Sequence, residues 1–169
     1  KLKASIPDAR MILEDLGLIT PEVTALRDKS GFPGLAVLQF AFGGGSDNFY
    51  LPHNLIPNSV VYTGTHDNDT SLGWYRSCGS QAHDHMRRYL RVDGTAASWD
   101  LIRSAWASVA KLCVVPMQDF LSLGSEARFN TPGTATGNWR WRCLDSQLHR
   151  FQTESAAYLR ELSTLYGRS

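Results

Sequence analysis

The 169-residue sequence lacks most of the features that would assign it to a specialised class of protein. It has only three cysteines, and they show no CxxC spacing, so neither a disulfide framework nor a zinc site is indicated. Lys and Arg total 17 against 16 for Asp and Glu, whereas a nucleic-acid-binding protein usually carries a basic excess. No apolar run approaches the roughly 20 residues that a membrane-spanning helix needs. We therefore expect neither a nucleic-acid partner nor a membrane partner.

The amino terminus, KLKASIPDAR, also lacks the apolar stretch of a secretory signal peptide. With the scattered cysteines, this predicts a reducing, cytoplasmic location. The chain is 43% hydrophobic, which argues against disorder. A chain of this length is sufficient for one domain with a core.

Apolar runs alternate with helix-like segments along the chain. The clearest helix signal is at 20–31, where Thr20 is a suitable N-cap, Pro21 suits the first helical position and Gly31 ends the helix. The predicted strands are continuous apolar runs, and the further predicted helices include an amphipathic one with Trp99 and Trp106 on its apolar face. The strands are at 9–17, 34–42, 60–69 and 111–121, and the further helices are at 80–91, 95–111 and 145–166.

Continuous apolar strands that alternate with helices predict an α/β fold with a parallel sheet covered by helices. Polar side chains collect where these strands end, at Glu14, at His66 and Asp67, and at Gln118 and Asp119. In a (β/α)₈ barrel and in a doubly wound sheet, this end of the strands carries the active site. The pattern alone does not decide between the two folds.

Two carboxylates on different strand ends, with a histidine beside one of them, suggest glycoside chemistry. Retaining cleavage needs an acid that protonates the leaving oxygen and a carboxylate nucleophile, and further acidic groups can hold sugar hydroxyls. Such a reaction needs neither a metal nor an organic cofactor, and we expect none.

Each candidate also has an ordinary structural explanation. Glu14 could be a solvated carboxylate at a strand end, and Asp67 could form an Asx turn, although Asn68 and Asp69 are expected to fill that role. A lone histidine such as His66 is most often structural. Asp119 is expected to hydrogen-bond loops together. The NWRWR stretch (138–142) is expected to pack at the bottom of a barrel or against a missing half of the fold.

Three long motifs, in order along the chain, resemble the amylomaltase or 4-alpha-glucanotransferase family, the disproportionating enzymes. They are ILEDLGLITPEVTALRDKSGFPGLAVLQFAF, NSVVYTGTHDNDTSLGW and PMQDFLSLGSEARFNTPGTATGNWRWR. The resemblance implies a retaining transglycosylase on a (β/α)₈ TIM barrel, acting on alpha-1,4-glucans or maltooligosaccharides. It implies that Glu14 is the general acid/base and Asp67 the transition-state stabiliser. It also implies that His66 contacts the sugar and that Asn130 is a further substrate contact.

In that family the nucleophilic Asp lies on the strand before the EDLG strand, and no residues precede Lys1 here. The resemblance therefore implies that residues 1–169 are the C-terminal half of the catalytic barrel, supplying strands 5 to 8 and a C-terminal helix. It further implies that the partner of this chain is the missing N-terminal half or a second copy. The alternative is a non-catalytic module that binds glucan or a partner subunit.

Overall fold

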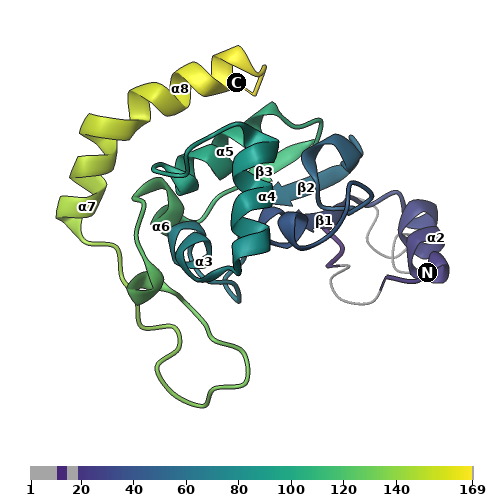
Figure 1. Cartoon of the computed structure of the whole chain (residues 1–169), viewed down its shortest axis with the longest axis horizontal. Coiled ribbons are helices and arrows are strands. Elements are labelled where there is room, and N and C mark those ends of the chain that lie inside the picture. The colour runs from purple at the N-terminus through teal and green to yellow at the C-terminus, as the bar shows by residue number, and fades with distance from the viewer. Residues whose placement is uncertain (1–10, 15–18, 169) are drawn as a thin grey trace.

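The computed structural model describes residues 11–14 and 19–168, and within this part the chain forms a small parallel sheet with helices packed on it (Figure 1). The sheet strands are β1 (Gly34–Val37), β2 (Ser59–Tyr62) and β3 (Leu112–Val114). Their order is β1-β2-β3, and both pairings are parallel. Leu13 adds a parallel bridge to Gly34, with its amide 2.9 Å from the carbonyl oxygen of Pro33. Four extended segments thus lie side by side in sequence order.

Helices connect these strands and follow the last of them (Figure 1). They are α2 (Pro21–Ser30), α3 (Ser71–Ser77), α4 (Ser80–Leu90), α5 (Ala97–Ala107), α6 (Met117–Phe120), α7 (Asp145–Arg150) and α8 (Ala156–Leu165). Three 3₁₀ segments, η1 (Leu38–Gly43), η2 (Pro52–Asn54) and η3 (Ser125–Ala127), and a π-helical segment (Phe151–Ser155) complete them. None of the helices in the described part of the chain combines the length and the hydropathy needed to span a bilayer.

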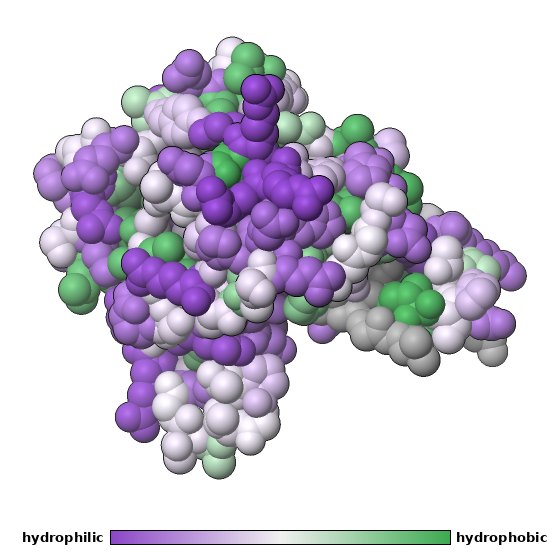
Figure 2. Space-filling view, in the orientation of Figure 1, coloured by the Kyte–Doolittle hydropathy of each residue, from purple (hydrophilic) through white to green (hydrophobic). Residues whose placement is uncertain are grey.

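The core forms between the sheet and the helices α4 and α5. Ala36 and Val61 of the sheet are fully buried, and they belong to the same apolar cluster as Phe42, Met86 and Leu101. The outer face of α4 is hydrophilic, as the centre of Figure 2 shows. The helix therefore has one face in the core and one in solvent, as an amphipathic surface helix should.

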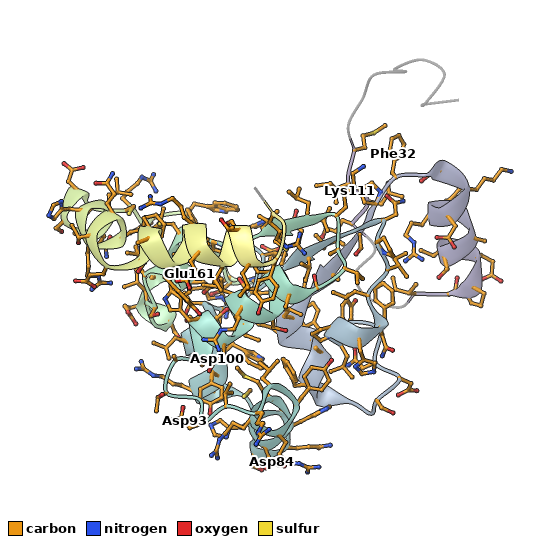
Figure 3. The ribbon with its side chains drawn as sticks, turned by 90° about the horizontal axis from the view of Figure 1, so that it is seen from above. Phe32, Asp84, Asp93, Asp100, Lys111 and Glu161 are labelled. Carbon is orange, nitrogen blue, oxygen red and sulfur yellow. The ribbon has the colours of Figure 1, made fainter. Side chains whose placement is uncertain are left out.

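The parallel direction of the strands separates the two ends of the sheet. Phe32 lies two residues before β1 and Lys111 directly before β3, and both are at the same end of the sheet in Figure 3. The carboxyl ends of the strands lie at the opposite end, where β2 runs into Thr63 and Gly64.

Several predicted elements are confirmed. In α2, the Thr20 hydroxyl accepts a hydrogen bond from the amide of Val23, Pro21 is the first residue, and Gly31 has a left-handed φ of 70°. The helices predicted at 80–91 and 95–111 correspond to α4 and α5. The final helix is continuous from α7 through the π-helical segment to α8. Of the strand predicted at 9–17, residues 9–10 and 15–17 lie outside the described residues.

Three predictions of secondary structure were wrong in part. The strand at 34–42 ends at Val37 and continues as η1, whose residues Leu38 and Phe42 are buried in the apolar core cluster. The strand at 111–121 ends at Val114, and α6 begins after Pro116, which has no amide proton to donate to a sheet. The stretch predicted as a strand at 60–69 is a strand only to Tyr62. Buried apolar runs have the same composition in a strand and in a helical turn, so they do not reveal where the change occurs.

Candidate active site

The segment 63–71, which links β2 to α3, is the centre of the candidate site. Two of its residues make the turn. The Oδ1 atom of Asn68 accepts hydrogen bonds from the amide and hydroxyl of Thr65, at 2.9 and 2.8 Å. One carboxylate oxygen of Asp69 accepts from the amide of Thr70 at 2.8 Å. Asn68 and Asp69 therefore bond locally within the segment, but neither makes the predicted Asx turn, in which the side-chain oxygen accepts from the amide two residues further on.

A buried carboxylate holds both ends of the segment. Asp119, from α6, is completely buried and accepts hydrogen bonds from the hydroxyl of Thr63, and from the amide and hydroxyl of Ser71 at 2.7 Å each. Burial raises the pKa of Asp119, although these three donors act in the opposite direction. The prediction that Asp119 would hydrogen-bond loops together is confirmed.

The middle of the segment is fixed by closely packed neighbours. Gln39 donates a hydrogen bond of 2.8 Å to the carbonyl oxygen of Asp69. A Cβ atom on Gly64 would lie 2.4 Å from the Gln39 amide nitrogen, so only glycine leaves room for this contact. On the other side, the second carboxylate oxygen of Asp69 accepts from the hydroxyl of Ser125 at 2.7 Å.

Three of the four predicted site residues line one cavity of about 380 Å³. Glu14 enters it from the segment beside β1, and His66 and Asp67 enter it from the end of β2. Tyr62 also lines the cavity, and its pKa is raised by burial and secondarily by the negative charge of Glu14. The carboxylates of Glu14 and Asp67, which come from different segments beside the sheet, therefore line the same cavity.

The Asp67 side chain has a polar partner on each side. Its Oδ1 atom lies 2.5 Å from the Nδ2 atom of Asn130 and 3.2 Å from the Nε2 atom of His66. About half of each side chain remains exposed, 55% for His66 and 45% for Asp67, so both are accessible to a ligand. Asn130, the fourth predicted residue, thus joins the site through its contact with Asp67.

The segment that carries Asn130 also provides an aromatic wall. Trp141 lines the cavity, and the Trp139 indole lies over the His66 ring, with centroids 5.1 Å apart. Trp139 has a φ of 62°, a conformation that is unfavourable for a bulky residue. Of the two places expected for 138–142, the bottom of a barrel was wrong, because these rings lie at the cavity beside His66, and packing against a missing half stays a prediction. The site residues that sequence reasoning missed are Tyr62, Arg128, Trp139 and Trp141; of these, only the two tryptophans gave a signal, in the NWRWR stretch.

The groups at the site support acid/base chemistry and the binding of hydroxyl-rich ligands. Carboxylates, an imidazole and an amide can exchange hydrogen bonds with several hydroxyl groups, and indole faces can pack on an apolar ring face. Across residues 11–14 and 19–168, no group of three or more His, Cys, Asp or Glu side chains is placed to hold a metal ion.

Comparison with known proteins now assigns the chain. The family model described as 4-alpha-glucanotransferase matches residues 1–147. The chain belongs to the 4-alpha-glucanotransferase family. The chloroplastic/amyloplastic 4-alpha-glucanotransferase DPE1 of Arabidopsis thaliana is 50% identical over 161 residues, which are 94% of this chain and 28% of that protein. The 4-alpha-glucanotransferase of Clostridium butyricum is 44% identical over 169 residues, which are 99% of this chain and 34% of that protein.

Two solved structures share the fold of this chain. Amylomaltase from Streptococcus agalactiae, in complex with acarbose, superposes with a TM-score of 0.89 at 31% identity, over 98% of this chain and 33% of that one. Amylomaltase from Corynebacterium glutamicum, at 19% identity and a TM-score of 0.63, shares the fold over 96% of this chain and 29% of that one. The chain thus spans about a third of the length of the proteins that it matches.

The buried carboxylate leads to a prediction about pH and stability. Because burial raises the pKa of Asp119 above its ordinary value of 3.8, ionisation of this group opposes folding. Its stabilising contribution is complete below that value and is lost as pH rises through the folded-state pKa. We expect the free energy of unfolding of the wild-type protein, relative to the Asp119→Asn variant, to decline as pH rises from about 3.8 and then to level off. Denaturant unfolding of both proteins across pH measures this difference, and a constant difference would contradict the prediction.

Proposed function

We propose that this glucanotransferase chain is part of an enzyme that transfers alpha-1,4-glucan segments to an acceptor sugar with retention of configuration. The observation that carries the proposal is that the carboxylates of Glu14, beside the Leu13 bridge to β1, and of Asp67, in the turn after β2, line one cavity. The family membership and the names of the relatives support the enzyme, and they do not support the alternative of a non-catalytic module. The Streptococcus agalactiae amylomaltase was solved with acarbose, which supports a carbohydrate as the ligand of the corresponding cavity here.

The proposed roles follow the chemistry of retaining glycosidases. Glu14 protonates the leaving oxygen while a carboxylate from another part of the enzyme attacks the anomeric carbon and forms a glycosyl-enzyme. Glu14 then acts as a base on an incoming sugar hydroxyl. Asp67 binds sugar hydroxyls more strongly as the ring distorts towards the transition state. These steps use side chains alone.

His66 and Asn130 complete the proposed sugar-binding surface. The imidazole of His66 is half exposed beside Asp67, which suits a contact with a sugar hydroxyl. The Nδ2 atom of Asn130 is directed at Asp67, so we assign its Oδ1 atom to the substrate. Asn130 thereby has two roles: its Oδ1 atom binds the sugar, and its Nδ2 atom orients the Asp67 carboxylate.

We also propose that the segment around Leu13, with β1, β2 and β3, forms strands 5 to 8 of a (β/α)₈ barrel. One support is that strands adjacent in the sequence pair in parallel. Another is that the chain spans about a third of the length of a related amylomaltase. The N-terminal half of the barrel, or a second copy, would then pair with the outer strands. A cytoplasmic location stays a prediction, since the Arabidopsis relative is named as a plastid protein.

The proposed activity has a direct test. Incubation of the full-length enzyme that contains this chain with maltotriose should give glucose and a ladder of longer maltodextrins. The total number of reducing ends should stay nearly constant, because transfer replaces one glycosidic bond by another. A steady rise in reducing ends without longer products would indicate hydrolysis and would contradict the proposal.

The proposed roles of the two carboxylates predict the effects of their replacement. In the full-length enzyme, Glu14→Gln should reduce transfer by about 10²–10⁴-fold, because the acid/base group is lost while the shape is kept. Asp67→Asn should also reduce kcat strongly, because its contacts strengthen in the transition state. Transfer rates with maltotriose and thermal unfolding of each variant provide the measurement. A near-native rate in either variant would remove that residue from the mechanism.

The barrel assignment predicts the behaviour of residues 1–169 expressed alone. A closed barrel leaves no strand edge unpaired, whereas four strands of eight leave two edges and expose part of the interior. The isolated chain should therefore associate or fold only marginally, and it should be inactive without the nucleophile. Activity should appear when the N-terminal half is added. Light scattering and the maltotriose assay test this, and a stable, active monomer would contradict the barrel assignment.

A further inference from the structure

Arg128 lies in the cavity wall and has no role in the scheme above. Its Nη2 atom donates a hydrogen bond of 2.7 Å to the carbonyl oxygen of Asp67, and its Nε atom donates one of 2.8 Å to the carbonyl oxygen of Asn130. In the part of the chain that the structure describes, no carboxylate pairs with this guanidinium. The guanidinium thus bonds to the backbone carbonyl oxygens of Asp67 and Asn130, whose side chains also contact each other at the site.

These two bonds close a short cycle of contacts around the Asp67 carboxylate. The Asn130 side chain donates to the Asp67 carboxylate, and the Asn130 amide donates to the carbonyl oxygen of His66 at 3.1 Å. Arg128 then joins the backbones of Asp67 and Asn130 through one rigid group. The position of the Asn130 side-chain amide relative to the Asp67 carboxylate therefore depends on the Arg128 guanidinium.

We propose that Arg128 is a positioning residue that fixes the Asp67 carboxylate in the cavity. The proposal rests on the proposed function, because it assigns Arg128 an effect on the step that Asp67 assists. Arginine suits this task because its planar group presents several N–H donors in a fixed arrangement. Lysine would offer a single mobile ammonium group, which cannot hold two carbonyl oxygens in the same fixed geometry.

The position of the Arg128 guanidinium also explains why replacing this residue should affect catalysis more than substrate binding. Arg128 bonds to the backbone carbonyl oxygens of Asp67 and Asn130, so its replacement leaves the groups that bind the sugar in place but less precisely oriented. A small misplacement of a catalytic group is sufficient to lower the rate by about 10²-fold. Contacts that strengthen in the transition state are reflected in kcat, whereas contacts made equally in the ground state are reflected in KM.

The test uses Arg128→Gln and Arg128→Lys in the full-length enzyme with maltotriose. We expect kcat to fall by up to about 10²-fold for the glutamine variant and less for the lysine variant, with KM nearly unchanged. Arg150→Gln is the matched control, because Arg150 also donates to a backbone carbonyl, that of Leu121 at 2.9 Å, away from Asp67. It should keep near-native kcat. Thermal unfolding shows whether each variant folds, and if the glutamine variant does not, the lysine variant carries the test.

A double-mutant cycle separates positioning from a general structural effect. If Arg128 acts through Asp67, Arg128→Gln should lower the rate of the Asp67→Asn enzyme far less than it lowers that of the wild type. Equal fold-losses in both backgrounds, or a near-native kcat in Arg128→Gln, would overturn the positioning role while leaving the proposed function intact. Failure of the proposed function has a different signature, namely a wild-type enzyme that makes no maltodextrin ladder or an Asp67→Asn variant that keeps its rate.

Discussion

The contact on which the rest of the site depends is the one between the buried Asp119 carboxylate and the two ends of the segment 63–71. A carboxylate is costly to bury, and it is tolerated in a protein interior only when donors surround it. Here Thr63 supplies one donor and Ser71 two. The bonds join the end of β2, the start of α3 and the short helix α6. The chain between Thr63 and Ser71 must therefore turn within a fixed span, and His66 and Asp67 lie at the middle of that turn.

The turn is held by different kinds of contact on its two sides. Behind it, Gln39 and Gly64 pack so closely that a methyl group would not fit between them. In front of it, Asn130 and Arg128 contact Asp67 from a segment more than sixty residues away in the sequence. Gln39 and Arg128 bond to backbone carbonyl oxygens and fix the path of the backbone, whereas Asn130 bonds to the Asp67 carboxylate and fixes the direction of that side chain. Both kinds are needed, because a half-exposed carboxylate such as Asp67 would otherwise rotate freely among its rotamers.

The sequence allowed the elements with local signals to be predicted. Thr20, Pro21 and Gly31 marked α2 because an N-cap, a first-turn proline and a left-handed glycine act on their own neighbours. The break at Val37 could not be found, because the apolar residues that follow are buried equally well by η1 as by a strand. The helix α3 was missed as well, although Thr70 caps it by accepting from the amide of Gly73. Its few residues follow a polar turn and carry no clear apolar period.

The site shows the same division. Glu14, His66 and Asp67 were predicted because each follows an apolar run at a strand end, and because the family motif includes them. That Asn68 and Asp69 bond within the turn could be predicted because such bonds are local, although the Asx-turn geometry expected for them is not the one that forms. The role of Arg128 could not, because its partner at the site, the backbone carbonyl of Asp67, lies far away in the sequence. A backbone acceptor has no residue identity, so no sequence pattern records its partner.

The contacts around the segment 63–71 explain how a chain that spans a third of the length of its relatives can hold a defined wall of the site. Asp119, Gln39, Asn130 and Arg128 all lie within the described residues, and each of them bonds to the segment 63–71 that carries Asp67. The wall is thus positioned by contacts inside the chain, whereas a retaining reaction also needs a carboxylate nucleophile opposite the acid/base group. In the proposed enzyme the two parts have separate tasks. One presents a preformed surface for the sugar, and the other brings the attacking group to it, so that alignment between them is the geometric condition for turnover.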